Sequence, residues 1–212
     1  DIAKRFDEFR EKTKIFLPDG KVLAVVEKGK LKRVTVNVQH PLKCNMEELE
    51  KAIKKVINLD GAVIDVNTDK YFIKGGISND TGLTGRKIIV DTYGGLAPHG
   101  GGAFSGKDPT KVDRSAAYMC RYVAKSLVAN DFATECQVAV SYNFGEDRPA
   151  MIVVTADGEY SEKITKFVKS KFDFSPNSII ERLNLRFTKY YPTSKYGHFT
   201  DPKYEWEKIC EL

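Results

Sequence analysis

The sequence predicts an α+β fold, in which helices cover one face of mostly antiparallel sheets. Two hairpins of alternating apolar and polar residues, at 22–39 and 137–155, indicate the antiparallel strands. Each hairpin is followed by a stretch whose apolar residues recur at helical spacing. The two halves therefore share the order strand, strand, helix without obvious sequence repetition, and the length suits one large domain or two modest ones.

The first half predicts two amphipathic helices around a hairpin. Ile2, Phe6 and Phe9 lie near one face of the opening stretch, and the turn at 28–30 joins the two strands. Asn45 is expected to cap the second helix. The predicted elements are a helix at 1–14, strands at 22–26 and 31–39, a helix at 46–59, and extended segments at 62–66 and 71–74.

The second half predicts a buried helix, a second hairpin and an aromatic carboxyl end. The stretch 115–129 is rich in alanine and apolar residues with few charges, which is typical of a largely buried helix. The other predicted elements are a short strand at 88–90, paired strands at 137–142 and 151–155, a helix capped by Ser161, and a helix from Asn177 through Leu185. Residues 189–206 are aromatic and irregular, and we expect them to strap over the core.

Composition excludes several classes of protein. Of 212 residues 42% are apolar and 30% charged, as in a folded domain, and no run approaches the ~20 apolar residues that span a bilayer. No secretory signal opens the chain, so a soluble, cytoplasmic protein is expected. The net charge of +5 is spread over lysines paired with acids, which does not favour nucleic acid. The four cysteines lack CxxC spacing and are expected to be free thiols.

A glycine-rich loop at 94–113 is the strongest functional pattern. Gly100, Gly101 and Gly102 let the backbone approach a ligand and turn its N–H groups inward, as an anion site requires. Two lysines, Lys107 and Lys111, and two aspartates, Asp108 and Asp113, follow. Lysine neutralises phosphate and carboxylate binds hard cations, so the loop suits a polyphosphate with Mg2+.

The same loop fits part of the P-loop pattern GxxxxGK[ST], from Gly101 to Lys107. The next residue is Asp108, where a P-loop has the Ser or Thr that binds Mg2+, and Pro109 follows at once. We therefore do not expect a P-loop.

The amino-acid sequence of the loop and its flanks resembles that of S-adenosylmethionine synthetase (methionine adenosyltransferase). The matching stretches are GGGAFSGKD at 100–108, DTGLTGRK at 80–87, KVDRSAAY at 111–118, YGHF at 196–199 and WE at 206–207. The resemblance implies repeated β-β-α-β units and face-to-face dimers. It also implies that residues 1–73 are the later part of a middle domain and 74–212 a carboxyl-terminal domain. The family's GHPDK and GAGDQG segments, from an N-terminal domain, are missing from this sequence.

The resemblance also assigns site residues. It places Asp19, Lys21, Phe72, Asp80, Arg86, Lys87, Ala103 and Lys107 at ATP, Asp80 and Lys111 near methionine, and Asp113 on Mg2+, with Lys107, Arg86 and Lys87 acting on the polyphosphate. Local rules leave other roles open: a solvated turn for Asp19 and Lys21, a turn cap for Asp80, core packing for Phe72 and a solvated pair for Arg86 and Lys87. Tyr71 departs from the family, which usually has a basic residue there.

None of the three histidines is expected to be catalytic. His40 ends a strand, His99 is expected to fix the loop's shape, and His198 to pack in the carboxyl tail.

The function that the resemblance implies is synthesis of S-adenosylmethionine from ATP and L-methionine, with two Mg2+ and K+, in a dimer or dimer of dimers. Three interpretations of the missing N-terminal part then stay open: the chain is a fragment of a full enzyme, a companion chain supplies the remainder, or the chain is a form that has lost catalysis. The alternative is a non-catalytic nucleotide- or partner-binding module.

Overall fold

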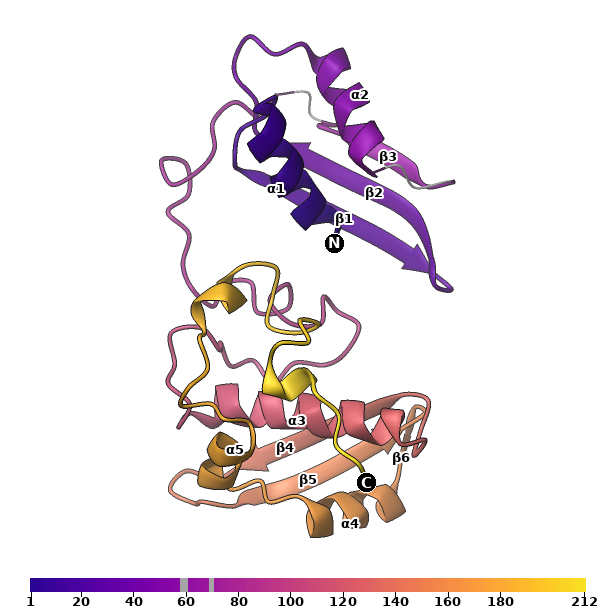
Figure 1. Ribbon diagram of the computed structural model, residues 1–212, viewed down its shortest axis with the longest axis vertical. Helices are drawn as coiled ribbons and strands as arrows, with labels where there is room; N and C mark the ends of the chain where they lie inside the picture. The colour runs from indigo at the N-terminus through magenta and orange to yellow at the C-terminus, as the bar shows by residue number, and fades with distance from the viewer. Residues whose placement is uncertain (58–60, 69–70) are drawn as a thin grey trace. The chain divides into compact units, whose positions relative to one another are not determined.

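The computed structural model describes residues 1–57, 61–68 and 71–212 (Figure 1). Internal contacts divide the chain into two compact units, Asp1–Gly82 and Leu83–Leu212. Both units repeat one order of elements, in which a helix precedes a hairpin and a second helix follows it. The α+β class predicted from the sequence is confirmed.

The first unit is a three-stranded sheet with two helices on one face (Figure 1). Its elements are α1 (Ile2–Thr13), β1 (Gly20–Glu27), β2 (Lys30–Val38), α2 (Met46–Ile57) and β3 (Val63–Val66). Strand β1 pairs with β2 antiparallel, and β3 pairs with β2 parallel. The helices and hairpin lie where the sequence predicted them. The predicted end of the second helix, at 58–59, lies outside the described residues.

The two periodicities of the sequence meet in the core of this unit. Val34, Val36 and Val38 alternate on one face of β2 and are buried. Leu49 and Ile53 lie one turn apart on α2 and are also fully buried. The remaining members of this core cluster are Phe6, Phe16 and Ile57.

Two asparagine side chains in the first unit form hydrogen bonds with main-chain groups at the ends of its elements. The Asn45 side chain accepts hydrogen bonds from Glu47 N–H (3.1 Å) and Glu48 N–H (3.3 Å), so it caps α2 as predicted. The buried Asn67 side chain accepts from Val38 N–H and donates to Val38 C=O. It thereby satisfies two main-chain groups at the end of β2. Residues 71–74, predicted as extended, belong to no strand.

The second unit also has helices over one face of a three-stranded sheet, here entirely antiparallel in the order β4-β5-β6. Its elements are α3 (Val112–Ala129), β4 (Cys136–Tyr142), β5 (Pro149–Ala156), β6 (Glu159–Tyr160), α4 (Glu162–Lys171), α5 (Pro176–Arg182) and the short 3-10 helices η1 (Tyr191–Ser194) and η2 (Glu205–Glu207). The Ser161 hydroxyl accepts from Ile164 N–H at 3.3 Å, so its predicted cap is confirmed.

Two local predictions were wrong. Residues 88–90 form turns and no strand, because the main chain closes on itself: Asp91 N–H donates to Lys87 C=O at 2.9 Å. Helix α5 begins at Pro176 with Ser175 as its N-cap, so Asn177 lies inside the helix. Proline has the backbone angle of a first helical residue and lacks only an N–H that would be unpaired there.

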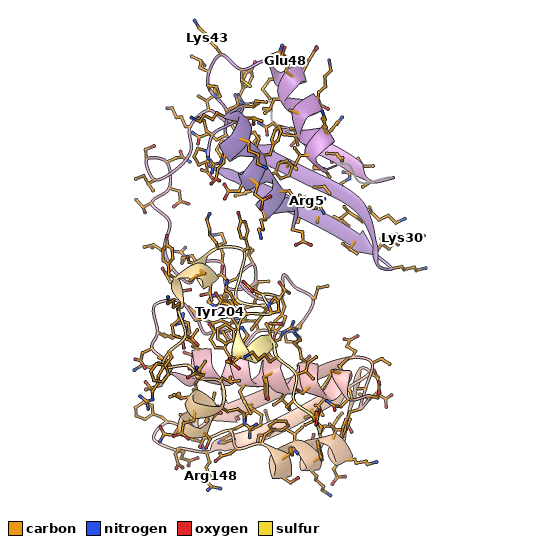
Figure 2. All side chains as sticks on the ribbon, viewed as in Figure 1. Arg5, Lys30, Lys43, Glu48, Arg148 and Tyr204 are labelled. Carbon is orange, nitrogen blue, oxygen red and sulfur yellow. The ribbon has the colours of Figure 1, made fainter. Side chains whose placement is uncertain are left out.

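The carboxyl end straps across the core of the second unit, as predicted. Trp206 is fully buried and stacks on Tyr118 of α3 (3.9 Å between ring centres) and on Tyr204 (4.5 Å). Glu207 forms ion pairs with Arg121 at 3.0 Å and Lys125 at 2.8 Å. Figure 2 shows the side chains that gather around Tyr204 in this unit.

The four cysteines are free and half-buried. In the part of the chain that the structure describes, no helix combines the length and apolar character needed to cross a membrane.

Candidate active site

The glycine loop is anchored in the second unit by Phe104. This ring is 6% exposed although it lies in a loop of small and polar residues. The Phe104 ring packs edge to face against three aromatic rings: Tyr118 (5.4 Å between ring centres), His198 (5.1 Å) and Phe199 (6.2 Å). His99 stacks on it at 5.5 Å. Such contacts are the favoured arrangements of aromatic rings, so the loop is tied to the core at its centre.

His99 shapes the loop, as the sequence indicated. Its Nδ1 accepts a hydrogen bond from Gly101 N–H at 2.8 Å. Gly101 has a φ of +93°, a backbone angle that other residues rarely adopt. The conformation of the triple-glycine segment therefore depends on both residues.

The predicted phosphate cation and the predicted metal ligand lie together. Lys107 Nζ is 2.5 Å from Asp113 Oδ2, and a β-carbon at Gly102 would lie 2.5 Å from the Asp113 carboxylate carbon. Glycine at 102 thus leaves room for this carboxylate. Lys107 and Asp113 are both partly exposed, which leaves their charges accessible to a ligand.

The other charged pair of the loop is Asp108 with Lys111, whose Nζ lies 2.9 Å away. Hydrogen bonds from the Thr110 hydroxyl and then from Lys111 hold the pKa of the Asp108 carboxyl well below its usual range. Helix α3 starts only at Val112, and residues 88–90 are not a strand, so the strand–loop–helix context of a P-loop is absent.

The segment that carries Arg86 and Lys87 runs beside the glycine loop. A β-carbon at Gly85 would lie 2.5 Å from the Ala103 β-carbon, and one at Gly106 would lie 3.8 Å from the Thr84 methyl. The backbone immediately before Arg86 and Lys87 therefore contacts the glycine loop at Ala103. The structure places these two segments, which carry the predicted polyphosphate residues of this unit, side by side.

The other predicted ligands of ATP and methionine lie in the first unit. Asp19 Oδ2 accepts from Gly76 N–H at 2.8 Å, and Lys21 is exposed on β1. Phe72 is half-buried, and its N–H donates to His40 Nε2 at 3.1 Å. These contacts tie the start of β1 and the end of β2 to residues 72–76.

Asp80 belongs to the same unit and caps a turn. Its Oδ1 accepts a hydrogen bond from Gly82 N–H at 3.0 Å. This is the turn-capping role that the sequence had offered as the alternative to ligand binding.

The sequence did not predict that His198 contributes to this site. It was expected to pack in the tail, and it does, at 2% exposure. Its ring also reaches the glycine loop, where Nε2 lies 3.3 Å from the Ser105 hydroxyl. Burial, together with the nearby Arg114 guanidinium, lowers the pKa of His198 to about 4. The YGHF segment signalled importance, but no local pattern indicated the contact.

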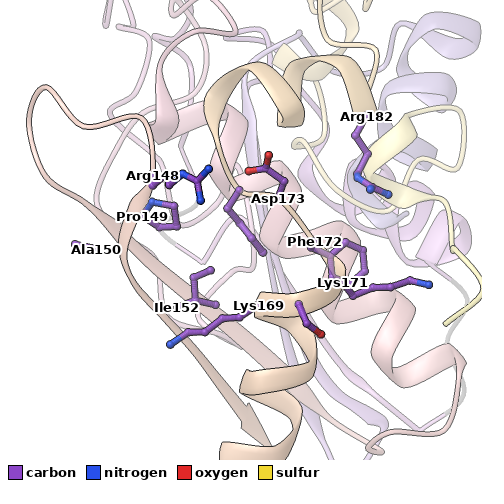
Figure 3. Close-up of a pocket in the computed structure, with 11 residues that line it drawn as sticks. Arg148, Pro149, Ala150, Ile152, Lys169, Lys171, Phe172, Asp173 and Arg182 are labelled. Atoms are coloured by element: carbon purple, nitrogen blue, oxygen red, sulfur yellow. The ribbon is translucent and has the colours of Figure 1, made fainter.

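A separate open cavity of about 630 Å3 lies beside β5 and the end of α4. Its lining includes the cations Arg148, Lys169, Lys171 and Arg182 around Asp173. In Figure 3 the ends of Lys169 and Lys171 point away from each other, so one compact anion does not contact both. None of the predicted site residues lines this cavity.

Within residues 1–57, 61–68 and 71–212, no group of three His, Cys, Asp or Glu side chains is placed to hold a metal ion. Asp113 does supply one hard, accessible oxygen donor beside the glycine loop. One carboxylate is compatible with a Mg2+ site only if the other ligands come from elsewhere.

Comparisons with known proteins decide the family. The family model described as S-adenosylmethionine synthetase, C-terminal domain, matches residues 74–208. The chain belongs to the S-adenosylmethionine synthetase family. An S-adenosylmethionine synthase of Kosmotoga olearia is 45% identical over 230 residues, and one of Petrotoga mobilis is 46% identical over 234. These alignments cover 99% and 100% of this chain but 58% of each relative.

The fold is also that of the family. The structure of an unusual S-adenosylmethionine synthetase from Campylobacter jejuni superimposes with a TM-score of 0.91 at 28% identity. The match covers 98% of this chain and 61% of that one. The chain thus spans about three fifths of the length of the family members it matches.

Proposed function

We propose that this chain forms the polyphosphate part of the active site of an S-adenosylmethionine synthase. The observation that carries the proposal is the anchored glycine loop, which holds Lys107 against Asp113 beside the segment with Arg86 and Lys87. The family membership and the names of the relatives support the reaction. In that reaction the sulfur of L-methionine displaces the triphosphate from C5' of ATP, and water then hydrolyses the triphosphate to pyrophosphate and phosphate.

The chemical demand on the site is to stabilise a departing polyanion. Fixed cations do so with little reorganisation, because they are already oriented when the charge develops. Lys107, Arg86 and Lys87 fill this role in the proposal, with Arg86 as a planar fork and the lysines as point charges. On substrate binding, Lys107 exchanges its contact with Asp113 for phosphate oxygens. Asp113 is then free to hold a Mg2+, which would neutralise further phosphate charge.

The remaining assignments are proposed with lesser roles. Ala103 offers a small side chain and its backbone to ATP, and Lys111 lies near methionine or the leaving phosphates. Asp19, Lys21 and Phe72 contribute to the ATP site, and Asp80 contacts ribose and methionine. A second Mg2+ and a K+ belong to the proposed site, with ligands outside residues 1–212.

The proposed domain division places residues 1–73 in a middle domain and 74–212 in a carboxyl-terminal domain. The proposed assembly is a dimer or a dimer of dimers in the cytoplasm, completed by N-terminal segments on the same or a companion chain. In the first unit, the sheet face away from the helices exposes Leu23 (64%), Val25 (46%) and Val63 (50%). A second copy would bury this apolar face.

The test uses the enzyme encoded by the whole gene. We expect Lys107→Ala to lower kcat for S-adenosylmethionine formation about 100-fold or more, the usual effect of removing one preorganised charge partner. Lys166→Ala, on the exposed face of α4, is the matched control and is expected to leave kcat unchanged. Normal turnover of the Lys107→Ala enzyme, measured at saturating ATP and methionine, would refute the assignment.

The alternative is a module that binds a nucleotide or partner without catalysis. The gene decides between the two, since an in-frame GHPDK segment upstream favours the enzyme. Its absence favours the module or an enzyme split over two chains.

A further inference from the structure

The backbone of His198 is fixed on both sides. Its N–H donates to Asp91 C=O at 2.9 Å, and its C=O accepts from the Trp206 indole N–H at 2.8 Å. The preceding Gly197 has a φ of +87°, and a β-carbon there would lie 2.9 Å from the Asp91 oxygen. The close approach of these two segments therefore requires glycine, and it sets the position from which the imidazole extends.

Both ring nitrogens of His198 have hydroxyl partners. Nδ1 lies 2.8 Å from the Tyr118 hydroxyl on α3, and Nε2 lies 3.3 Å from the Ser105 hydroxyl in the glycine loop. A neutral imidazole has one donor and one acceptor nitrogen, and a hydroxyl fills either role. The neutral ring thus links α3, the carboxyl tail and the glycine loop.

The same ring contacts a second residue of the loop. Phe104 meets His198 edge to face at 5.1 Å, next to the hydrogen-bonded Ser105. Lys107 N–H donates to Phe104 C=O at 3.2 Å, which closes a turn between the anchored residue and the lysine. The position of the lysine backbone is thereby coupled to residues that His198 holds.

We propose that His198 is a positioning residue, which through Ser105 and Phe104 holds the glycine loop in the shape that presents Lys107 to a polyphosphate. His198 itself touches no substrate. The inference deepens the proposed function and rests on it for the identity of the ligand. Its consequence is large, because a displacement of about 1 Å in a positioned group costs on the order of 100-fold in rate.

The test is a double-mutant cycle on the hydrogen bond between Ser105 and His198. The variants are Ser105→Ala, His198→Leu and the double variant, with His198→Gln as the rescue that restores a polar group near Nε2. Asn130→Ala is the matched control, because it removes a side-chain hydrogen bond to the tail at Cys210, away from the loop. The probe is inorganic tripolyphosphate with Mg2+, titrated by calorimetry, and hydrogen exchange of the amides of 101–107 is measured without ligand.

We expect each single variant to weaken tripolyphosphate binding about 3- to 10-fold, as loss of one hydrogen bond does. The double variant should be no weaker than the worse single variant, because the two residues act through one bond. His198→Gln should recover most of the affinity, and Asn130→Ala should bind normally. The loop amides should exchange about 10-fold faster in Ser105→Ala and His198→Leu, while Trp206 fluorescence stays that of the docked tail.

Additive losses in the cycle, or unchanged exchange of the loop amides in Ser105→Ala, would overturn the inference. If His198→Leu does not fold, Ser105→Ala and His198→Gln decide the question alone, since Ser105→Ala removes only a hydroxyl and His198→Gln keeps a polar side chain in the buried site. If the unmodified protein does not bind tripolyphosphate, the proposed phosphate site fails. The exchange measurement still decides the role of His198, because it needs no ligand.

Discussion

The two units share one order of elements and differ in how each is closed. In the first, β3 extends the sheet and Asn67 caps β2, around a core built mainly of aliphatic side chains. In the second, an irregular aromatic tail runs back over α3 and brings Trp206 and Phe199 into the core. That tail also meets the glycine loop. The catalytic loop of the proposed function therefore depends on the carboxyl tail, through contacts such as Ser105 with His198. The first unit is closed instead by β3 and by polar contacts such as Asn67 with Val38.

The largest expected loss of stability comes from substitution of Glu207. This residue is 4% exposed and anchors the carboxyl tail to α3. Burial raises the pKa of this carboxyl, but hydrogen bonds from Arg121 and Lys125 outweigh burial and lower it. Glu207→Ala should reduce the free energy of unfolding of the second unit by about 3–5 kcal/mol, because it leaves the partly buried cations Arg121 and Lys125 without their shared partner. Trp206, the one tryptophan, reports this transition in a denaturant titration.

The control is Glu205→Ala, which removes a partly exposed ion pair with Lys208. It should cost less than about 1 kcal/mol. Equal losses at Glu205 and Glu207 would mean that the tail is not held by the buried pair.

The second effect separates the cores. Leu49 is fully buried on α2, and Leu49→Ala should cost the first unit about 2–5 kcal/mol through lost burial and a cavity. The two core clusters share no residue, so the Trp206 transition should stay in place. Far-UV circular dichroism, which detects both units, should show an earlier first transition. A matching shift of the Trp206 signal would contradict the separation.

The third effect is a pH dependence confined to the second unit. The pKa of His198 is about 4 in the folded protein, below the value near 6.5 in an unfolded chain. The unfolded state therefore binds more protons between pH 6.5 and 4, so stability is complete above about pH 6.5 and falls as the pH drops. The loss across this window is about 2–3 kcal/mol.

The measurement is the Trp206 unfolding midpoint from pH 7 to pH 4. His198→Gln should flatten this profile, since the amide does not titrate. An unchanged slope in that variant would assign the acid sensitivity to other groups.

The smallest effect compares equivalent helix caps. Asn45 caps α2 and Ser161 caps α4, so each change to alanine should cost about 1 kcal/mol in its own unit. Thermal unfolding followed by circular dichroism and by Trp206 fluorescence distinguishes the two variants. Loss of stability in the opposite unit would count against the division into two cores.

Sequence reasoning succeeded where the signal was local. The alternation of Val34, Val36 and Val38 predicted a half-buried strand, and the spacing of Leu49 and Ile53 predicted the helix over it. It failed at 88–90, because a three-residue apolar run fits a turn as well as a strand and only a partner strand distinguishes them. The predicted cap at Asn177 is wrong because proline favours the first helical position, so the helix begins at Pro176.

The site divides in the same way. The sequence by itself determined the glycine loop, its lysines and aspartates, and the resemblance to the family that the comparisons then established. Only the tertiary structure decided that Lys107 lies against Asp113, that Gly85 lies against Ala103, and that His198 reaches Ser105. The physical reason is that residue type and spacing fix local backbone and charge. Contacts between distant residues, such as Ser105 and His198, which are 93 positions apart, depend instead on how the whole core packs.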